Sequence, residues 1–161
     1  MPAAWLRTGL AARAGLVLFM FFTLFEVAGR ALDYGSPNVG QELLGDFGLV
    51  IGGVSDDPEY GHVPEKPVMV GNGGDFMNGP QYEQRFLNSL AGPKGEALSW
   101  RRRGSAHPFA TENAPLPFGG GMLDVYEVTY PGLGEPILLY LNMYDSDLLL
   151  APVGFAVRAA K

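Results

Sequence analysis

Two histidines and two aspartates are the residues of this chain whose types best suit metal binding or catalysis. His62 lies in YGHVPEKP and His107 in GSAHPF, so the metal-binding spacings HxH and HxxxH do not occur. Asp145 and Asp147 alternate as at the start of a calcium loop, but the glycine and final glutamate of that loop are missing. We interpret them as a capped turn before three leucines. A histidine pair brought together by folding remains the alternative. We therefore predict no metal, no cofactor and no catalytic residue.

Three consecutive arginines, Arg101, Arg102 and Arg103, form the basic cluster of the chain. Successive side chains of a strand point to opposite faces, so at most two of the three share a face. We expect them to pair with Asp124 or Glu127 on a neighbouring strand. Contact with an anionic ligand or an acidic partner surface is the alternative. Asp124 and Glu127 themselves should lie on opposite faces, which excludes a carboxylate dyad between them.

The composition limits the class of protein. The 161 residues fit one domain and an appendage, and 23 glycines with 13 prolines favour turns and short strands. Residues 31–161 hold 16 acidic and 8 basic side chains, which argues against nucleic acid as a partner. The chain has no cysteine, so it can form neither a disulfide, a thiolate site nor a lipid-modified cysteine anchor. Any attachment to a membrane must therefore be made by the peptide itself.

An apolar run near the N-terminus predicts export. Arg7 and Arg13 precede an uncharged stretch from Ala14 to Phe25, which has the length of a signal-peptide core. Read as one helix, residues 10–32 cover about 34 Å, enough to span a bilayer. The preceding positive charges predict a cytoplasmic N-terminus and a translocated remainder. A cleaved signal and an uncleaved anchor both stay open, and we favour the anchor.

The expected anchor brings its apolar side chains into contact with membrane lipid. A buried helix of a cytosolic protein would normally show a polar side, and LVLFMFF shows none. The residues that we assign to lipid contact are Leu10, Leu16, Val17, Leu18, Phe19, Met20, Phe21, Phe22, Leu24 and Phe25.

Beyond the anchor we expect an α+β fold. Residues 1–32 form the signal-anchor or transmembrane helix, 33–59 a linker and irregular region, and 60–161 a small antiparallel β-sheet domain with one packed helix. The helix should begin at Asn78-Gly79-Pro80, because asparagine caps a helix and proline suits its first turn. It carries Tyr82, Phe86, Leu87 and Leu90 at helical spacing and should stop at Gly92-Pro93.

Strands are predicted from runs of β-branched and aromatic residues. The runs at 97–103, 122–130 and 136–144 should pair, the last two as a hairpin across residues 131–134. The third run is apolar on both faces, which predicts a central strand covered on both sides. A short strand is expected at 68–70, and a last strand at 154–158 should close the sheet.

Several blocks in order resemble a family of exported bacterial proteins that are often lipoproteins. The blocks are YGHVPEKPVMVGNGG, NGPQYEQRFLNSLAGPKGE, RRRGSAHPF, GGGMLDVYEVTYPGLGEPILLYLNMYD and LLAPVGF, which span residues 60–155. This chain has Ser105-Ala106-His107 where members of that family tend to show Ser-Cys-Cys, and it lacks the cysteine that a lipoprotein needs. The resemblance implies export and gives no catalytic residues.

Many members of that family are labelled 2-dehydro-3-deoxyphosphooctonate aldolase. Enzymes of that name resemble (β/α)₈ barrels, which need about 250 residues and eight strand-helix units. Roughly 130 residues with one convincing helix cannot build such a barrel. We therefore interpret the label as an error.

The sequence predicts a non-catalytic, membrane-anchored extracytoplasmic domain of a bacterium. We expect its main part in the periplasm and its function to be that of an accessory or interaction subunit of an inner-membrane complex, with a protein partner. One alternative is a small-ligand or cell-envelope binding protein that uses Trp100, Tyr126, Tyr140 and Tyr144. The other is an enzyme of unrecognised type.

Overall fold

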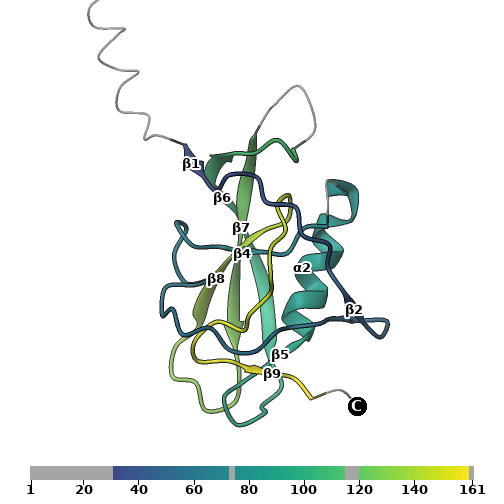
Figure 1. Cartoon of the computed structure of the whole chain (residues 1–161). Helices are drawn as coiled ribbons and strands as arrows, with labels where there is room; N and C mark the ends of the chain where they lie inside the picture. The colour runs from purple at the N-terminus through teal and green to yellow at the C-terminus, as the bar shows by residue number, and fades with distance from the viewer. Residues whose placement is uncertain (1–30, 73–74, 115–119, 160–161) are drawn as a thin grey trace, which may run out of the picture. The chain divides into compact units, whose positions relative to one another are not determined.

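The computed structural model describes residues 31–72, 75–114 and 120–159, which belong to one compact unit (Figure 1). They are mostly β-sheet with a single α-helix, and this confirms the α+β class. The expected anchor residues, from Leu10 to Phe25, lie outside the described residues. The main sheet has the order β1–β6–β7–β8–β4, with β1 at Leu32–Asp33, β6 at Ser99–Ala110, β7 at Gly120–Thr129, β8 at Ile137–Asn142 and β4 at Val68–Met69.

The centre of the sheet is antiparallel and its two edges are parallel. The predicted hairpin is confirmed, because β7 and β8 pair antiparallel from Val128 opposite Ile137 to Asp124 opposite Leu141. The expectation of a wholly antiparallel sheet was wrong, since β1 pairs parallel with β6 and β4 parallel with β8. Both edge strands reach the sheet through long connections rather than tight turns, and a long connection permits parallel pairing.

Strand β6 extends seven residues beyond its predicted end at Arg103. It pairs with β7 from Ser99 opposite Thr129 to Ala110 opposite Gly120, with register shifts at Arg102/Gly104 and Ala106/Pro108. Each shift is an extra residue that leaves the ladder and lets pairing resume beyond it. Glycine and proline at these positions made the sequence look like a turn.

Helix α2 runs from Gly79 to Asn88 and packs against one face of the sheet (Figure 1). It follows the 3₁₀-helix η1, Phe76–Asn78, and the predicted start is confirmed. The capping role expected of Asn78 was wrong: its side chain makes no cap and donates instead to Asp75, 2.8 Å away. Phe86 and Leu87 are buried in the core, as their spacing predicted. The remaining strand of this region is β5, Leu90–Ala91.

The last strand, β9 at Ala156–Val157, does not close the main sheet. It pairs antiparallel with β5 in a separate two-stranded sheet, Leu90 opposite Val157. The expectation of a closing strand was wrong because the order of the main sheet was not visible in the local pattern. That edge of the sheet is taken by β4 instead.

The segment expected to be a linker, residues 33–59, is built into the described unit. It holds β2, Leu43–Leu44, and β3, Gly48–Leu49, which pair as an antiparallel hairpin. Leu49 is fully buried, and its amide donates to the Ser89 hydroxyl at the end of α2. Further backbone bonds tie Gly52 to Leu149 and Ser55 to Ala151. We call residues 39–54 the strap.

The core lies between α2, the strap and the inner face of the sheet. Its fully buried members include Phe86 from the helix, Leu49 from the strap, and Leu139 and Leu141 from β8. Strand β8 is central, as predicted, with β7 and β4 on its two sides. Its second face carries Leu138 and Tyr140, which are only half-buried.

Replacing Leu139 by alanine should lower the free energy of unfolding by about 2 to 5 kcal/mol, because the truncation leaves a cavity in a packed core. The matched control is Leu148→Ala, whose side chain is 76% exposed and should change the free energy by less than about 0.5 kcal/mol. Urea unfolding of the intact chain in mild detergent, followed by circular dichroism, measures both. Equal losses in the two variants would contradict this arrangement of the core.

Candidate functional site

The three arginines of β6 divide between the two faces of the sheet. On the outward face, Arg101 donates through Nε and Nη2 to the two carboxylate oxygens of Glu127 at 3.0 Å each. Arg103 reaches the same carboxylate, with Nη1 3.6 Å from Oε2. The hydrogen bond from Arg101 lowers the pKa of Glu127. Two guanidinium groups thus share one carboxylate on this face.

Arg102 lies on the opposite face and binds Asp124. Its Nε is 2.5 Å from Oδ2 and its Nη2 is 2.6 Å from Oδ1, so the pair is bidentate. Ser105 donates its hydroxyl to the same Oδ1 at 2.8 Å. The predicted pairing of the arginines with Asp124 and Glu127 is confirmed, and so is the placement of these two acids on opposite faces.

A buried acid that the sequence analysis missed lies next to this pair. Glu83 of α2 is fully buried, and Tyr126 donates its hydroxyl to Oε2 at 2.9 Å. Burial, followed by the negative charge of Asp124, raises the pKa of Glu83 to about 8. Its Oε1 lacks a hydrogen-bond donor among the described residues. A raised pKa suits this burial, because a neutral carboxyl costs less to bury than a carboxylate.

The sequence carried a signal for Glu83. It lies three residues before Phe86 and four before Leu87, which places it on their helix face. Glutamate side chains are usually exposed to solvent, and the sequence analysis did not consider the position of Glu83 on the buried face of the helix. The resulting row of Tyr126, Glu83, Asp124 and Arg102 joins α2 to β7 and β6.

A second polar cluster surrounds Asp145 beyond the end of β8. Its carboxylate is fully buried and accepts hydrogen bonds from the Thr111 hydroxyl, from Asn113 Nδ2 at 2.9 Å and from Asn142 Nδ2 at 2.8 Å. The capped-turn interpretation was wrong for Asp147, because residues 147–150 form no turn or helix, although its exposed carboxylate accepts from the amide of Leu148. It was wrong for Asp145 as well, because the carboxylate holds the loop after β6 against the end of β8.

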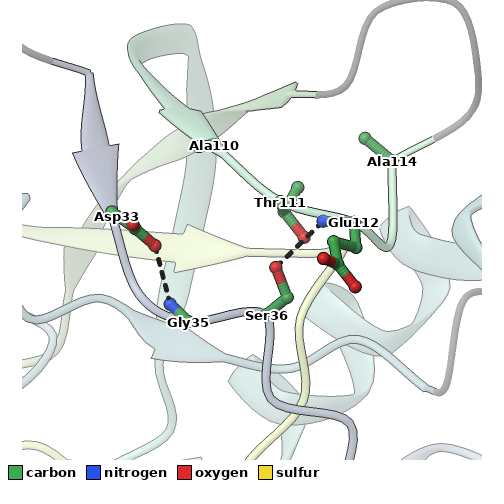
Figure 2. Close-up of a pocket in the computed structure, with 7 residues that line it drawn as sticks. All are labelled: Asp33, Gly35, Ser36, Ala110, Thr111, Glu112 and Ala114. Atoms are coloured by element: carbon green, nitrogen blue, oxygen red, sulfur yellow. Dashed lines mark hydrogen bonds between the residues drawn. The ribbon is translucent and has the colours of Figure 1, made fainter.

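A cavity of about 620 Å³ lies beside that loop. Its lining residues are Asp33, Gly35, Ser36, Ala110, Thr111, Glu112 and Ala114 (Figure 2). The amide of Gly35 donates to Asp33 Oδ1, and the amide of Glu112 donates to the Ser36 hydroxyl, both at 2.9 Å (Figure 2). Gly35 and Ser36 both have positive φ, which a turn of this shape requires. The cavity is therefore a depression between two fixed turns.

The histidines and aromatic residues are held by packing. His62 has Nε2 2.9 Å from the carbonyl oxygen of Val153, and its ring stacks on Phe155. His107 meets the ring of Tyr140 edge-on. Among the described residues, no group of three or more His, Asp or Glu side chains is placed to hold a metal ion.

The rings considered for ligand recognition likewise contact other rings. Trp100 packs edge-on against Tyr126, which is buried, and Tyr144 packs against Phe109. With Tyr140 against His107, each of these rings therefore has an aromatic partner within the protein.

The strap presents apolar side chains to solvent. Six of the eleven exposed large hydrophobic residues in the described part of the chain fall within residues 39–54: Val39, Leu43, Leu44, Phe47, Val50 and Val54. Phe47, at the tip of the β2–β3 hairpin, is 76% exposed. A groove of about 520 Å³ separates this hairpin from the end of α2 and the C-terminal segment, with Leu44, Phe47, Asn88 and Arg158 among its lining residues. Such clustering distinguishes the strap from surfaces with scattered apolar residues.

No protein-family model, curated protein or solved structure matches the chain. Among the described residues, no helix is long and apolar enough to cross a membrane. The anchor residues were not part of that search, because they lie outside the described residues.

Glu83→Gln should flatten the pH dependence of stability. The folded protein keeps a proton on Glu83 up to about pH 8, whereas the unfolded chain releases it near its ordinary pKa of 4.5. Folded protein thus binds more protons between these values, and the free energy of unfolding falls as pH rises, by at most about 1.4 kcal/mol per pH unit. Urea unfolding between pH 5 and pH 8 measures the slope. The exposed control Glu65→Gln should retain the slope, and a wild-type slope in Glu83→Gln would contradict this role.

Asp145→Asn should destabilise the protein by about 1 to 3 kcal/mol. The new amide nitrogen is itself a donor and faces one of the three side chains that donate to Asp145, so that side chain is left without an acceptor. The change keeps the size of the side chain, so packing is preserved. Asp147→Asn is the matched control at an exposed site and should be nearly neutral. Thermal unfolding by circular dichroism compares the two. Equal melting temperatures would show that the Asp145 cluster does not hold the loop.

Proposed function

We propose that this chain is a membrane-anchored extracytoplasmic domain that works by binding a protein partner, as an accessory or interaction subunit of an inner-membrane complex. The anchor is the apolar segment of residues 1–31, because Leu32 belongs to strand β1, with its N-terminus in the cytoplasm and the domain in the periplasm. The arginines ahead of the apolar run and the absence of acidic residues there support this orientation. The ordered blocks of residues 60–155 support membership of the exported bacterial family.

The single observation that carries the proposal is the exposed apolar hairpin of the strap. Its backbone is fixed by pairing of Leu43 with Leu49 and by the bond from Leu49 to Ser89. A fixed backbone loses little conformational entropy when a partner covers it, so the exposed Phe47 is prepared for burial. Large aromatic side chains near a groove are the usual anchors of protein interfaces.

Asp124 and Asp145, two of the three buried acids among the described residues, support a binding role rather than a catalytic one. Both oxygens of Asp124 accept from Arg102, and both oxygens of Asp145 accept from neighbouring side chains. Carboxylates whose lone pairs are occupied by protein donors hold structure together and are poorly placed to take a proton from a substrate.

Phe47→Ser should abolish a defined complex in the native membrane. The tagged full chain is extracted with a gentle detergent, and the size and stoichiometry of the complex are measured by native mass spectrometry. The wild type should form a complex with one partner at fixed stoichiometry. The amount of that complex should fall at least about tenfold in the variant. Leu148→Ser is the matched control, because this side chain is also 76% exposed and lies outside the strap.

A strictly monomeric wild type under gentle extraction would overturn the proposed function. An equal loss of the complex in Phe47→Ser and Leu148→Ser would show that exposed apolar residues act through nonspecific hydrophobic contact. Retention of the complex in Phe47→Ser would remove the hairpin from the interface.

A further inference from the structure

Strand β6 leaves most of its outer edge without a partner strand. It pairs with β7 along its whole length, from Ser99 to Ala110, whereas β1 pairs with it only at Phe109 and Ala110. In the part of the chain that the structure describes, no strand pairs with the outer edge before Phe109. None of the residues from Ser99 to Pro108 is buried. An accessible edge of this kind is a template for one more strand.

The edge is regular only over its first part. A bulge at Arg103 and a second one at His107, which has a positive φ, interrupt the ladder, and Pro108 lacks an amide hydrogen. Bulges and proline discourage pairing along an edge. The part before the second bulge and Pro108 is therefore the more open one; it includes Ser99 to Gly104, which contains all three arginines and is interrupted once, by the bulge at Arg103.

The charge of this stretch favours an acidic occupant. Arg101 and Arg103 are 72% and 54% exposed and share the single carboxylate of Glu127, so the outward face has a surplus positive charge. Residues 31–161 carry twice as many acidic as basic side chains, which makes this strand a local exception. Like charges opposite one another destabilise a strand pair, so a second copy of β6 is a poor partner.

An apolar hollow lies next to the arginines on the same strand pair. It has a volume of about 200 Å³ and is formed by Arg103, Gly104, Ser105, Ala106, Val125 and Leu138. Val125 and Glu127 are two residues apart on β7 and therefore share a face. A strand laid along β6 would place alternate side chains over this face, with carboxylates near the arginines and an apolar side chain near the hollow.

We propose that the edge of β6 from Ser99 to Gly104 accepts an extended acidic segment of a partner protein as an added β-strand. Two carboxylates of that segment, two residues apart, bind Arg101 and Arg103, and an apolar side chain enters the hollow formed by Val125 and Leu138. This inference rests on the proposed interaction function, because the added strand comes from the partner. It assigns that partner a chemistry and a site separate from the strap.

The test uses the full-length chain in mild detergent and a fluorescein-labelled octapeptide, Thr-Glu-Thr-Glu-Thr-Val-Thr-Thr, in which the two glutamates and the valine lie on one face of a strand. Binding is measured by fluorescence anisotropy. Arg101→Gln with Arg103→Gln should weaken binding by at least about tenfold, because two charge-assisted contacts are lost. Glu127→Gln should tighten binding by about threefold, because it removes the carboxylate that competes for the same arginines. Circular dichroism verifies that each variant is folded.

Two further peptides separate strand addition from simple charge attraction. A peptide with N-methylated threonines keeps its charge but loses backbone donors, so it should bind at least about tenfold more weakly. A peptide with glutamine in place of both glutamates keeps its donors but loses its charge and should also bind weakly. Undetectable binding of the acidic peptide by the wild type would overturn the inference. Equal binding of the N-methylated peptide, or an unchanged affinity in the arginine variant, would overturn it as well.

The Phe47→Ser chain separates this inference from the proposed function. It should bind the acidic peptide as the wild type does, because the strap and the β6 edge are different surfaces. A wild type that forms no complex in membranes but binds the peptide in the expected pattern would contradict the proposed function but not the β6 inference. A complex that depends on Phe47, together with failure of the peptide tests, would contradict the β6 inference but not the proposed function.

Discussion

The buried carboxylate of Asp124 determines how the three arginines of β6 are used. A carboxylate in the interior needs a cation and hydrogen-bond donors, and Arg102 with Ser105 supplies them. Alternation along the strand places Arg101 on the face opposite Arg102, and the bulge residue Arg103 reaches the same outward carboxylate. Among the described residues both pair with Glu127, which leaves a basic edge on an acidic domain. Burial and the negative charge of Asp124 raise the pKa of Glu83 on α2. One electrostatic requirement thus fixes the helix on the sheet and sets the charge of the edge.

The strap adds an exposed apolar surface to the basic edge of β6. Leu49 enters the core and fastens the β2–β3 hairpin to the end of α2 through Ser89. The neighbouring Leu44 and Phe47 are exposed and line the groove. A basic strand edge and a fixed apolar hairpin suit complementary kinds of contact: main-chain pairing with charge, and burial of aromatic area. Both are features of binding, and neither needs the protein to change shape.

Local patterns predicted the parts of the fold that depend on neighbouring residues. The β7–β8 hairpin followed from alternating apolar residues around a short turn, and α2 followed from the spacing of Phe86 and Leu87. The parallel edges, the pairing of β5 with β9 and the docking of residues 33–59 depend on contacts far apart in the sequence, which periodicity does not encode. The arginine pairs were predictable from strand alternation. The burial of Glu83 and of Asp145 was not predicted, because buried acids are rare and residue type alone points to solvent exposure.

Hydrogen-deuterium exchange of the full chain in isolated cell membranes, where we propose that it is anchored, compared with the purified chain in detergent, tests most directly whether partners cover these surfaces. The amides of residues 99–104 and 43–48 should exchange more slowly in the membrane, where the added strand and the covered hairpin protect them. The amides of residues 131–134, in the turn between β7 and β8, should exchange equally in both states. Equal exchange of the edge and the hairpin in the two preparations would contradict a function in binding a protein partner.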